Sequence, residues 1–229
     1  MNVSENAASW RVEHFGRERE PVVVIDGFSG CIDRIEATGR QARYEPVQGY
    51  PGVRSAFDPN YFALQGELLG RLFAEHFGLE KRFSAESCAL SMVSLHPEAL
   101  SQQQRRPHYD GTRPNLLATV HFTQGPETGG TAFYRHRRTG FETVTPERAD
   151  EYEAAVREDE REYGPLPPEY YYGDSERYEL IGEVEARPDR LIAYRGRRLH
   201  SGVIPTAPDP ATLRRSGRLT VNAFLIGEM

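Results

Sequence analysis

Three residues of this chain have the types and spacing to bind one metal ion. His108 and Asp110 are separated by one residue, and in an extended segment such residues point to the same face. An imidazole and a carboxylate can therefore converge from one stretch of backbone. His200 is the best candidate for a third ligand, because it follows an apolar strand predicted at 191–194 and a turn at 195–197. We predict a metal site formed by His108, Asp110 and His200.

Two imidazoles and one carboxylate on one side of a metal ion leave the opposite coordination positions open. This arrangement is the facial triad of non-haem Fe(II) oxygenases, so the three residues are also predicted to be catalytic. Four other histidines are expected to be structural. His14 and His76 are expected to pack or to lie on the surface, and His96 and His136 to be hydrogen-bonded near strand ends.

The last predicted strand alternates strictly between apolar and polar residues. One face carries Leu219, Val221, Ala223 and Leu225, and the other carries Arg218, Thr220 and Asn222, ending in Phe224. The polar face either meets water or points into a barrel that holds the metal. In the second case the arginine and threonine would form a receptor for a carboxylate, with a charged fork and a hydroxyl. The far carboxylate of 2-oxoglutarate requires such a receptor.

The elements that must position these residues are mostly short strands. Residues 21–28 predict a buried strand, and Asp58-Pro59 predicts the start of a helix that Gly78 ends. From residue 87 onward the pattern is typical of strands, which we predict at 88–95, 116–123, 131–134, 178–184, 190–194 and 218–226. The fold class is therefore α+β, mainly β, with a sandwich or barrel braced by helices on one side.

One segment interrupts the strands. Thr145-Pro146 predicts the start of a charged helix that runs to about Tyr163, and a cluster of three tyrosines follows at 170–172. This helical, tyrosine-rich insertion is either a solvated excursion or a lid over the active site.

The length predicts a single domain over residues 1–229. Within it, residues 1–86 would form an N-terminal strand and helical support, and residues 87–229 the core, with the insertion at 145–177.

Composition excludes several classes of protein. A net charge of −6 argues against a dedicated nucleic-acid binder, and no apolar run is long enough to span a bilayer. The two distant cysteines do not form a disulfide framework, and the N-terminus lacks the pattern of a signal peptide. We expect a cytoplasmic protein with no nucleic-acid or membrane partner, and the composition leaves the oligomeric state open.

The strings around the predicted ligands resemble the Fe(II)/2-oxoglutarate-dependent dioxygenases, most closely the prolyl-hydroxylase-like branch. The matching segments are His108-Tyr109-Asp110, Ala118–Thr123, Gly129–Phe133, Leu199–Gly202 and Arg218-x-Thr220. The resemblance implies a double-stranded β-helix, or jelly roll, that binds Fe(II), 2-oxoglutarate and O₂. It implies that His108, Asp110 and His200 bind the metal, and that Arg218 and Thr220 bind 2-oxoglutarate. Prolyl hydroxylases usually have lysine where Arg218 stands.

The resemblance further implies an oxidoreductase that oxidises an aliphatic C–H bond and releases succinate and CO₂. The expected substrate is a small molecule, either an amino acid or a specialised metabolite from a biosynthetic route. The outcome would be hydroxylation, desaturation or ring closure. Tyr109, Arg113 and Arg135 are candidate substrate contacts, because arginines near the iron would suit a carboxylate-bearing substrate.

Two alternatives remain open at this stage. One is a cupin-like hydrolase or isomerase that holds zinc or manganese on the same three residues. The other is a non-catalytic binding protein on the same barrel.

Overall fold

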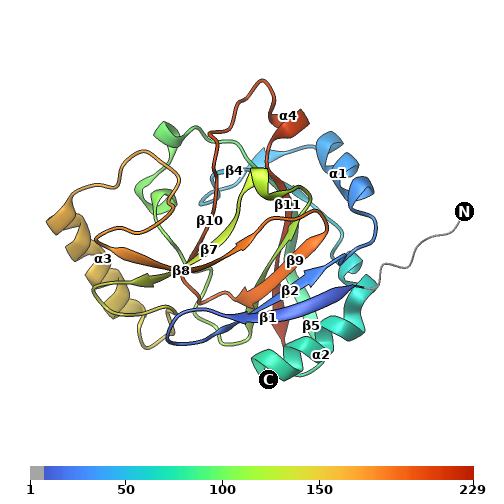
Figure 1. Ribbon diagram of the computed structural model, residues 1–229, viewed down its shortest axis with the longest axis horizontal. Helices are drawn as coiled ribbons and strands as arrows, with labels where there is room; N and C mark the ends of the chain where they lie inside the picture. Colours follow the sequence, from blue (N-terminus) through green and yellow to red (C-terminus); the bar gives the residue numbers. More distant parts are fainter. Residues whose placement is uncertain (1–7) are drawn as a thin grey trace, which may run out of the picture.

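The computed structural model describes residues 8–229. Residues 1–7, where the predicted N-terminal segment begins, lie outside the described part of the chain. The described residues are mainly β, as the sequence predicts, and form two antiparallel sheets (Figure 1). Between residues 8 and 229 no helix is both long enough and apolar enough to cross a membrane.

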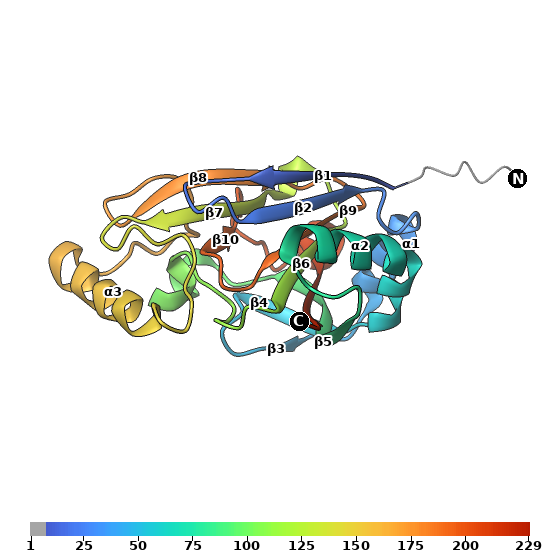
Figure 2. The ribbon, with the colours of Figure 1, turned by 90° about the horizontal axis from the view of Figure 1, so that it is seen from below.

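The larger sheet curves around the molecule. In Figure 2 its strands β1 and β2 lie in one layer with β7 and β8 of the smaller sheet, whereas β3, β4 and β5 lie in the opposite layer. The order of the larger sheet is β1 (Ser9–His14), β2 (Pro21–Asp26), β9 (Arg190–Arg195), β6 (Leu116–Phe122), β11 (Leu219–Gly227), β5 (Phe83–Val93), β4 (Gly52–Ala56), β3 (Glu45–Pro46). The smaller sheet has the order β10 (His200–Gly202), β7 (Gly130–His136), β8 (Tyr178–Glu185).

The predicted alternation along the last strand is present in β11. Leu219 and Val221 pack with Ile35 in one apolar cluster. Ala223 and Leu225 join a second cluster beneath the helices. The opposite face of β11 carries Thr220, which is buried, and Asn222 and Phe224, which are partly buried.

Helices α1 (Ile32–Gln41) and α2 (Gly66–Phe77) cover one end of the larger sheet, and α3 (Ala149–Tyr163) lies at the other end of the molecule (Figure 1). The left-handed Gly78 (φ +62) ends α2 as predicted. The remaining helices are short: η1 (Pro59–Gln65), η2 (Pro97–Ala99), η3 (Gln102–Arg105), η4 (Pro126–Thr128) and α4 (Leu213–Ser216).

The helix predicted from Pro59 differs from the prediction in its first half. Asp58 caps it by accepting a hydrogen bond from the backbone N–H of Asn60, but residues 59–65 form the 3₁₀ helix η1, and α2 begins only at Gly66. Tyr61 and Phe62 are adjacent, and both contact Phe28, with ring centroids 5.7 and 6.2 Å away. This packing accompanies the tighter turn.

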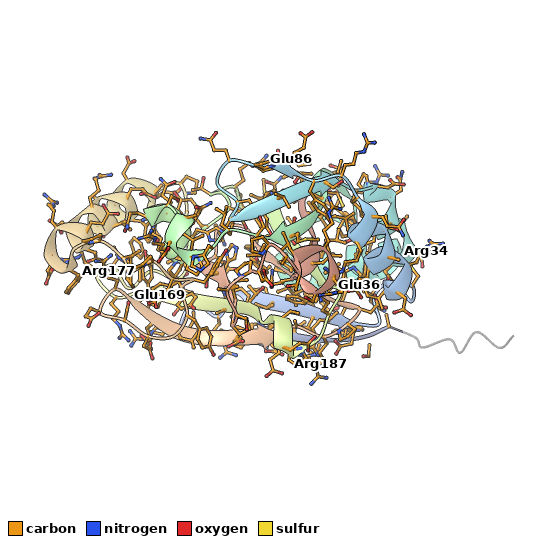
Figure 3. All side chains as sticks on the ribbon, turned by 90° about the horizontal axis from the view of Figure 1, so that it is seen from above. Arg34, Glu36, Glu86, Glu169, Arg177 and Arg187 are labelled. Atoms are coloured by element: carbon orange, nitrogen blue, oxygen red, sulfur yellow. The ribbon has the colours of Figure 1, made fainter. Side chains whose placement is uncertain are left out.

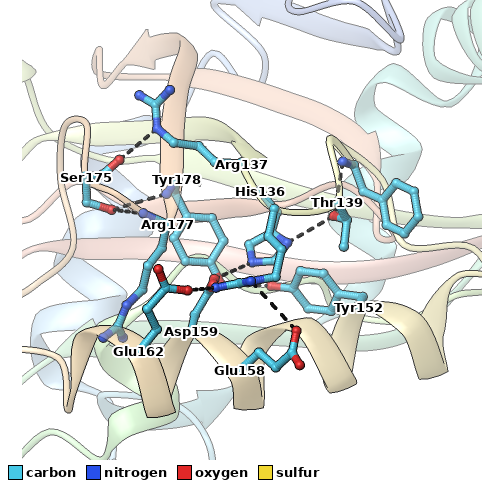
Figure 4. A network of polar contacts seen from close by, with 12 residues as sticks. His136, Arg137, Thr139, Tyr152, Glu158, Asp159, Glu162, Ser175, Arg177 and Tyr178 are labelled. Atoms are coloured by element: carbon cyan, nitrogen blue, oxygen red, sulfur yellow. Dashed lines mark hydrogen bonds and ion pairs between the residues drawn. The ribbon is translucent and has the colours of Figure 1, made fainter.

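The insertion is anchored to the smaller sheet by a polar network (Figure 4). Its helix α3 (Ala149–Tyr163) buries Tyr152 and Asp159. Asp159 accepts a hydrogen bond from Arg138 Nε at 2.6 Å and contacts His136 Nε2 at 2.8 Å, and the hydroxyls of Tyr152 and Tyr178 lie 3.0 Å apart. These buried contacts exclude a fully solvated surface segment. The insertion packs against the rest of the domain.

Substitution of the shared carboxylate should destabilise the fold. Asp159→Ala leaves the buried His136 ring and the Arg138 guanidinium without their common partner, so we expect the free energy of unfolding in urea to fall by roughly 3 kcal/mol. Glu158→Ala is the matched control on the same helix. Glu158 is 57% exposed and lies 3.7 Å from Arg138, so its loss should cost at most about 1 kcal/mol. Equal losses in the two variants would contradict the anchoring role of Asp159.

Candidate metal centre and its cavity

Backbone pairing brings together residues that are far apart in the sequence. The N–H of His108 donates to the carbonyl of His200, and the N–H of His200 donates to the carbonyl of His108, both at 2.9 Å. The N–H of Asp110 donates to the carbonyl of Gly196 at 2.7 Å. The segment that carries His108 and Asp110 is therefore held in extended form beside the segment that carries His200.

The side chains of the three predicted ligands meet at one point. Each offers one ligand atom, and these atoms lie within 4.8 Å of one another. Asp110 Oδ1 lies 3.8 Å from His108 Nε2, and Asp110 Oδ2 lies 3.5 Å from His200 Nε2. The two imidazole rings are tilted by 49°, with centroids 4.4 Å apart. Such a cluster of two nitrogens and one oxygen can hold a divalent metal ion.

A second layer of contacts fixes the orientation of His200. Its Nδ1 lies 2.8 Å from the carbonyl oxygen of Arg198. Donation from Nδ1 leaves the lone pair of Nε2 directed at the cluster, which is how ligating histidines are oriented. Arg198 is itself fully buried. Its guanidinium lies 4.6 Å from the centre of the Phe133 ring and donates to the carbonyl oxygens of Phe15 and Glu20.

The electrostatics of the cluster favour uncharged imidazoles. Burial lowers the pKa of His200 to about 4. The His108 side chain is 52% exposed and lines the cavity. Desolvation by the surrounding protein, followed by repulsion from His200, lowers its pKa to about 4 as well. Burial raises the pKa of Asp110. At neutral pH both imidazoles are in the form that binds metal.

The cluster opens into a cavity of about 670 Å³, a size typical of sites for drug-sized ligands. Seven aromatic side chains line it: Tyr50, Tyr109, Tyr152, Tyr170, Tyr171, Tyr194 and Phe224. Tyr152, Tyr170 and Tyr171 come from the insertion at 145–177, so this segment forms part of the wall. It is therefore placed to contact whatever occupies the cavity.

Arg218 and Thr220 lie on the face of β11 expected for a carboxylate receptor. Arg218 lines the cavity, donates to the carbonyl of Gly130 at 3.0 Å, and has no acidic partner between residues 8 and 229. Its buried Nε has no hydrogen-bond partner there either. Thr220 is buried next to it and donates to Oδ1 of Asn222 at 2.6 Å. Asn222, rather than Thr220, reaches the cavity surface.

The three candidate substrate contacts have different locations. Tyr109 lines the cavity, but Arg113 and Arg135 do not. Arg113 forms an exposed ion pair at 2.6 Å with Glu86, which points away from the molecule (Figure 3). Arg135 is buried and donates from Nε to Glu142 at 2.8 Å. These carboxylates already neutralise the two arginines, so the structure does not support them as substrate contacts.

Two other arginines line the cavity, and the sequence-based prediction missed both. Arg106 lies two residues before His108, so the spacing rule that links His108 to Asp110 could have found it. Arg54 lies on β4, a strand that was not predicted, so no local pattern pointed to it.

The fold of this chain is similar to that of a solved non-haem, α-ketoglutarate-dependent enzyme. The "non-heme alpha ketoglutarate dependent epimerase SnoN from nogalamycin biosynthesis" matches with a TM-score of 0.51 at 12% identity, over 92% of this chain and 79% of SnoN. A likeness at this identity defines the fold alone.

Two further solved structures match less well. HygX from Streptomyces hygroscopicus, with nickel and 2-oxoglutarate bound, has a TM-score of 0.46 at 15% identity, over 91% of this chain and 83% of its own. The viral collagen prolyl hydroxylase of Paramecium Bursaria Chlorella virus-1, in its 2-oxoglutarate complex, has a TM-score of 0.46 at 10% identity, over 91% and 96%.

The sequence itself matches one family model. Residues 6–225 match a family of unknown function, DUF6445, and the chain belongs to this family. A search of the curated proteins returned no match.

The lowered pKa of His200 predicts how the metal-free protein responds to acid. The folded value of about 4 lies below the unfolded value of about 6.5. Folded protein therefore binds fewer protons, and this contribution to stability is present above pH 6.5 and is lost as the pH falls toward 4. We expect His200→Gln to flatten the decline in the free energy of unfolding between pH 7 and pH 5, measured by urea denaturation. His96→Gln, on a side chain that is 61% exposed, is the control. An unchanged slope in the His200 variant would contradict the prediction.

Proposed function

We propose that this protein is a non-haem Fe(II)/2-oxoglutarate-dependent oxygenase that oxidises an aliphatic C–H bond of a small molecule, with succinate and CO₂ as co-products. One observation carries the proposal. The cluster of His108, Asp110 and His200 opens into the same cavity as the guanidinium of Arg218, which lacks an acidic partner among residues 8–229. Metal ligands and a carboxylate receptor in one cavity are what a metal enzyme needs to bind 2-oxoglutarate.

The residues present fit Fe(II). Two neutral imidazole nitrogens and one carboxylate oxygen form the donor set of non-haem iron oxygenases. The contact of His200 Nδ1 with the Arg198 carbonyl directs Nε2 toward the cluster before a metal binds. In this proposal His108, Asp110 and His200 are the metal ligands.

The residues of β11 fit the co-substrate. We assign Arg218 as the partner of the far carboxylate of 2-oxoglutarate, because a guanidinium binds a carboxylate through a charge-assisted, bidentate contact. Burial lowers the pKa of Arg218, and a bound carboxylate would offset that cost. Thr220 shares this face, and in this proposal it supports the receptor through Asn222, to which its hydroxyl donates, rather than by donating to the carboxylate itself.

The wider fold supports the same assignment. We interpret the two facing sheets as the double-stranded β-helix of these oxygenases, with residues 87–229 as its core and residues 1–86 as support in a single domain. When bound, Fe(II), 2-oxoglutarate and O₂ supply the oxidising chemistry. The chain's own residues orient the substrate, and the tyrosine-rich walls exclude water from the reacting centre.

The first test of the proposal is the visible charge-transfer band of an iron–2-oxoglutarate complex. Anaerobic protein mixed with Fe(II) and 2-oxoglutarate should develop this band, and Asp110→Ala or His200→Ala should abolish it because each removes a ligand. His96→Ala is the control and should retain the band. Correctly folded wild-type protein without the band would contradict the proposal and would favour a hydrolase on the same three residues, which needs no 2-oxoglutarate.

The second test concerns the carboxylate receptor. Arg218→Met should weaken 2-oxoglutarate binding ~100-fold, because it leaves the co-substrate's far carboxylate without its charged partner. Isothermal titration of Ni(II)-loaded protein measures this affinity directly. Arg113→Met, which removes an exposed arginine outside the cavity, is the control and should bind normally. The assignment fails if Arg218→Met keeps the wild-type affinity for 2-oxoglutarate, or if the variant also loses Ni(II).

A further inference from the structure

Arg54 is a second guanidinium in the cavity that the proposed function does not use. It lies on β4 and lines the cavity, and its Nε is buried without a hydrogen-bond partner. Among residues 8–229 no carboxylate forms an ion pair with it. Its guanidinium carbon lies 4.2 Å from the centre of the Tyr50 ring. A partly buried charge in this state is costly unless a ligand pairs with it.

The strand register separates Arg54 from the receptor for 2-oxoglutarate. Arg54 pairs with Ser91 of β5, and Ser91 pairs with Thr220 of β11. Cross-strand partners share a face, so Arg54 points to the same side as Thr220 but lies two strands away, about 10 Å at ordinary strand spacing. One ligand carboxylate near Thr220 therefore leaves Arg54 available.

The two arginines line the same cavity as the metal cluster but contact different groups. The guanidinium of Arg54 lies over the ring of Tyr50. Arg218 instead donates to the carbonyl of Gly130, and its guanidinium carbon lies 5.7 Å from the centre of the Phe122 ring. The two guanidinium groups can therefore bind separate anions.

The other arginine in the cavity is already paired. Arg106 lies 3.7 Å from Glu153 of α3, so part of its charge is neutralised. This comparison leaves Arg54 as the cationic group best able to bind an incoming anion near the metal cluster.

We propose that Arg54 binds an oxyanion, a carboxylate or a phosphate, of the substrate. This inference rests on the proposed function and deepens it by naming the substrate class: an anionic molecule with an apolar or aromatic body. Tyr109, Tyr170 and Tyr171 line the same cavity and would contact that body. Its volume of about 670 Å³ accommodates such a ligand beside 2-oxoglutarate. The sequence-based expectation of a carboxylate-bearing substrate is retained, but on a different arginine.

The experiment compares matched charged and neutral probes. Protein loaded with Ni(II), with and without 2-oxoglutarate, is titrated with N-benzoylglycine, with its primary amide and with phenyl phosphate, and binding is followed by saturation-transfer NMR. At least one oxyanion should bind about tenfold to a hundredfold more tightly than the amide, as expected for a hydrogen bond to a charged group. The stronger of the two identifies the oxyanion as carboxylate or phosphate.

Variants assign the preference to Arg54. Arg54→Met and Arg54→Gln should both bind oxyanion and amide equally while keeping the wild-type melting temperature and 2-oxoglutarate affinity. Arg54→Lys should keep part of the preference, because it retains the charge but not the planar fork. Arg113→Met is the matched control on a surface arginine and should behave as the wild type.

Three results would overturn the inference. In the first, neither oxyanion binds wild-type protein more tightly than the amide. In the second, both Arg54 variants that lack the charge keep the full preference. In the third, these variants weaken the binding of 2-oxoglutarate as strongly as Arg218→Met does, which would place Arg54 in the co-substrate site. Failure of the proposed function is a separate result: wild-type protein would then bind no 2-oxoglutarate, whereas the probe comparison with Ni(II) alone would still report on Arg54.

Discussion

The candidate site depends on one backbone interaction, the reciprocal pair of hydrogen bonds between His108 and His200. Each residue donates its N–H to the other's carbonyl, so the two imidazoles are held near each other by main-chain geometry rather than by a ligand. The bond from Asp110 to the Gly196 carbonyl extends this pairing by one more step. The conformational entropy of the three side chains is therefore lost during folding. A metal ion would bind to ligands that are already in place.

The second constraint is an imbalance of charge inside the cavity. Outside the cavity, some buried arginines are matched by carboxylates, as Arg135 is by Glu142 and Arg190 is by Asp26, and buried Arg198 donates to the backbone carbonyls of Phe15 and Glu20. Arg54 and Arg218 have no such match among residues 8–229. An unpaired positive charge in a partly buried site is costly. A ligand with a negative charge would lower that cost. In the proposed function, these two guanidinium groups receive negative charge from the co-substrate and the substrate.

The sequence predicts the features that depend on local spacing. The alternation of β11, the cap at Asp58 and the stop at Gly78 all follow from the order of neighbouring residues, and so does the shared face of His108 and Asp110. It does not predict which charges are compensated. Arg113 and Arg135 are close in sequence to the strands of the predicted site. Their acidic partners, Glu86 and Glu142, are identified only by tertiary contacts. Arg54 is missed for the converse reason, since its importance lies in a partner that it lacks.

The insertion has a consequence for how this scaffold can change. Its helix is fastened to β7 through Asp159 and His136, whereas Tyr170 and Tyr171 line the cavity. Tyr152 does both, because it lines the cavity and its hydroxyl lies 3.0 Å from that of Tyr178. Replacement of Tyr170 and Tyr171 would therefore remodel the ligand space without touching the anchor or the histidines, so ligand selectivity can change while the metal cluster is kept.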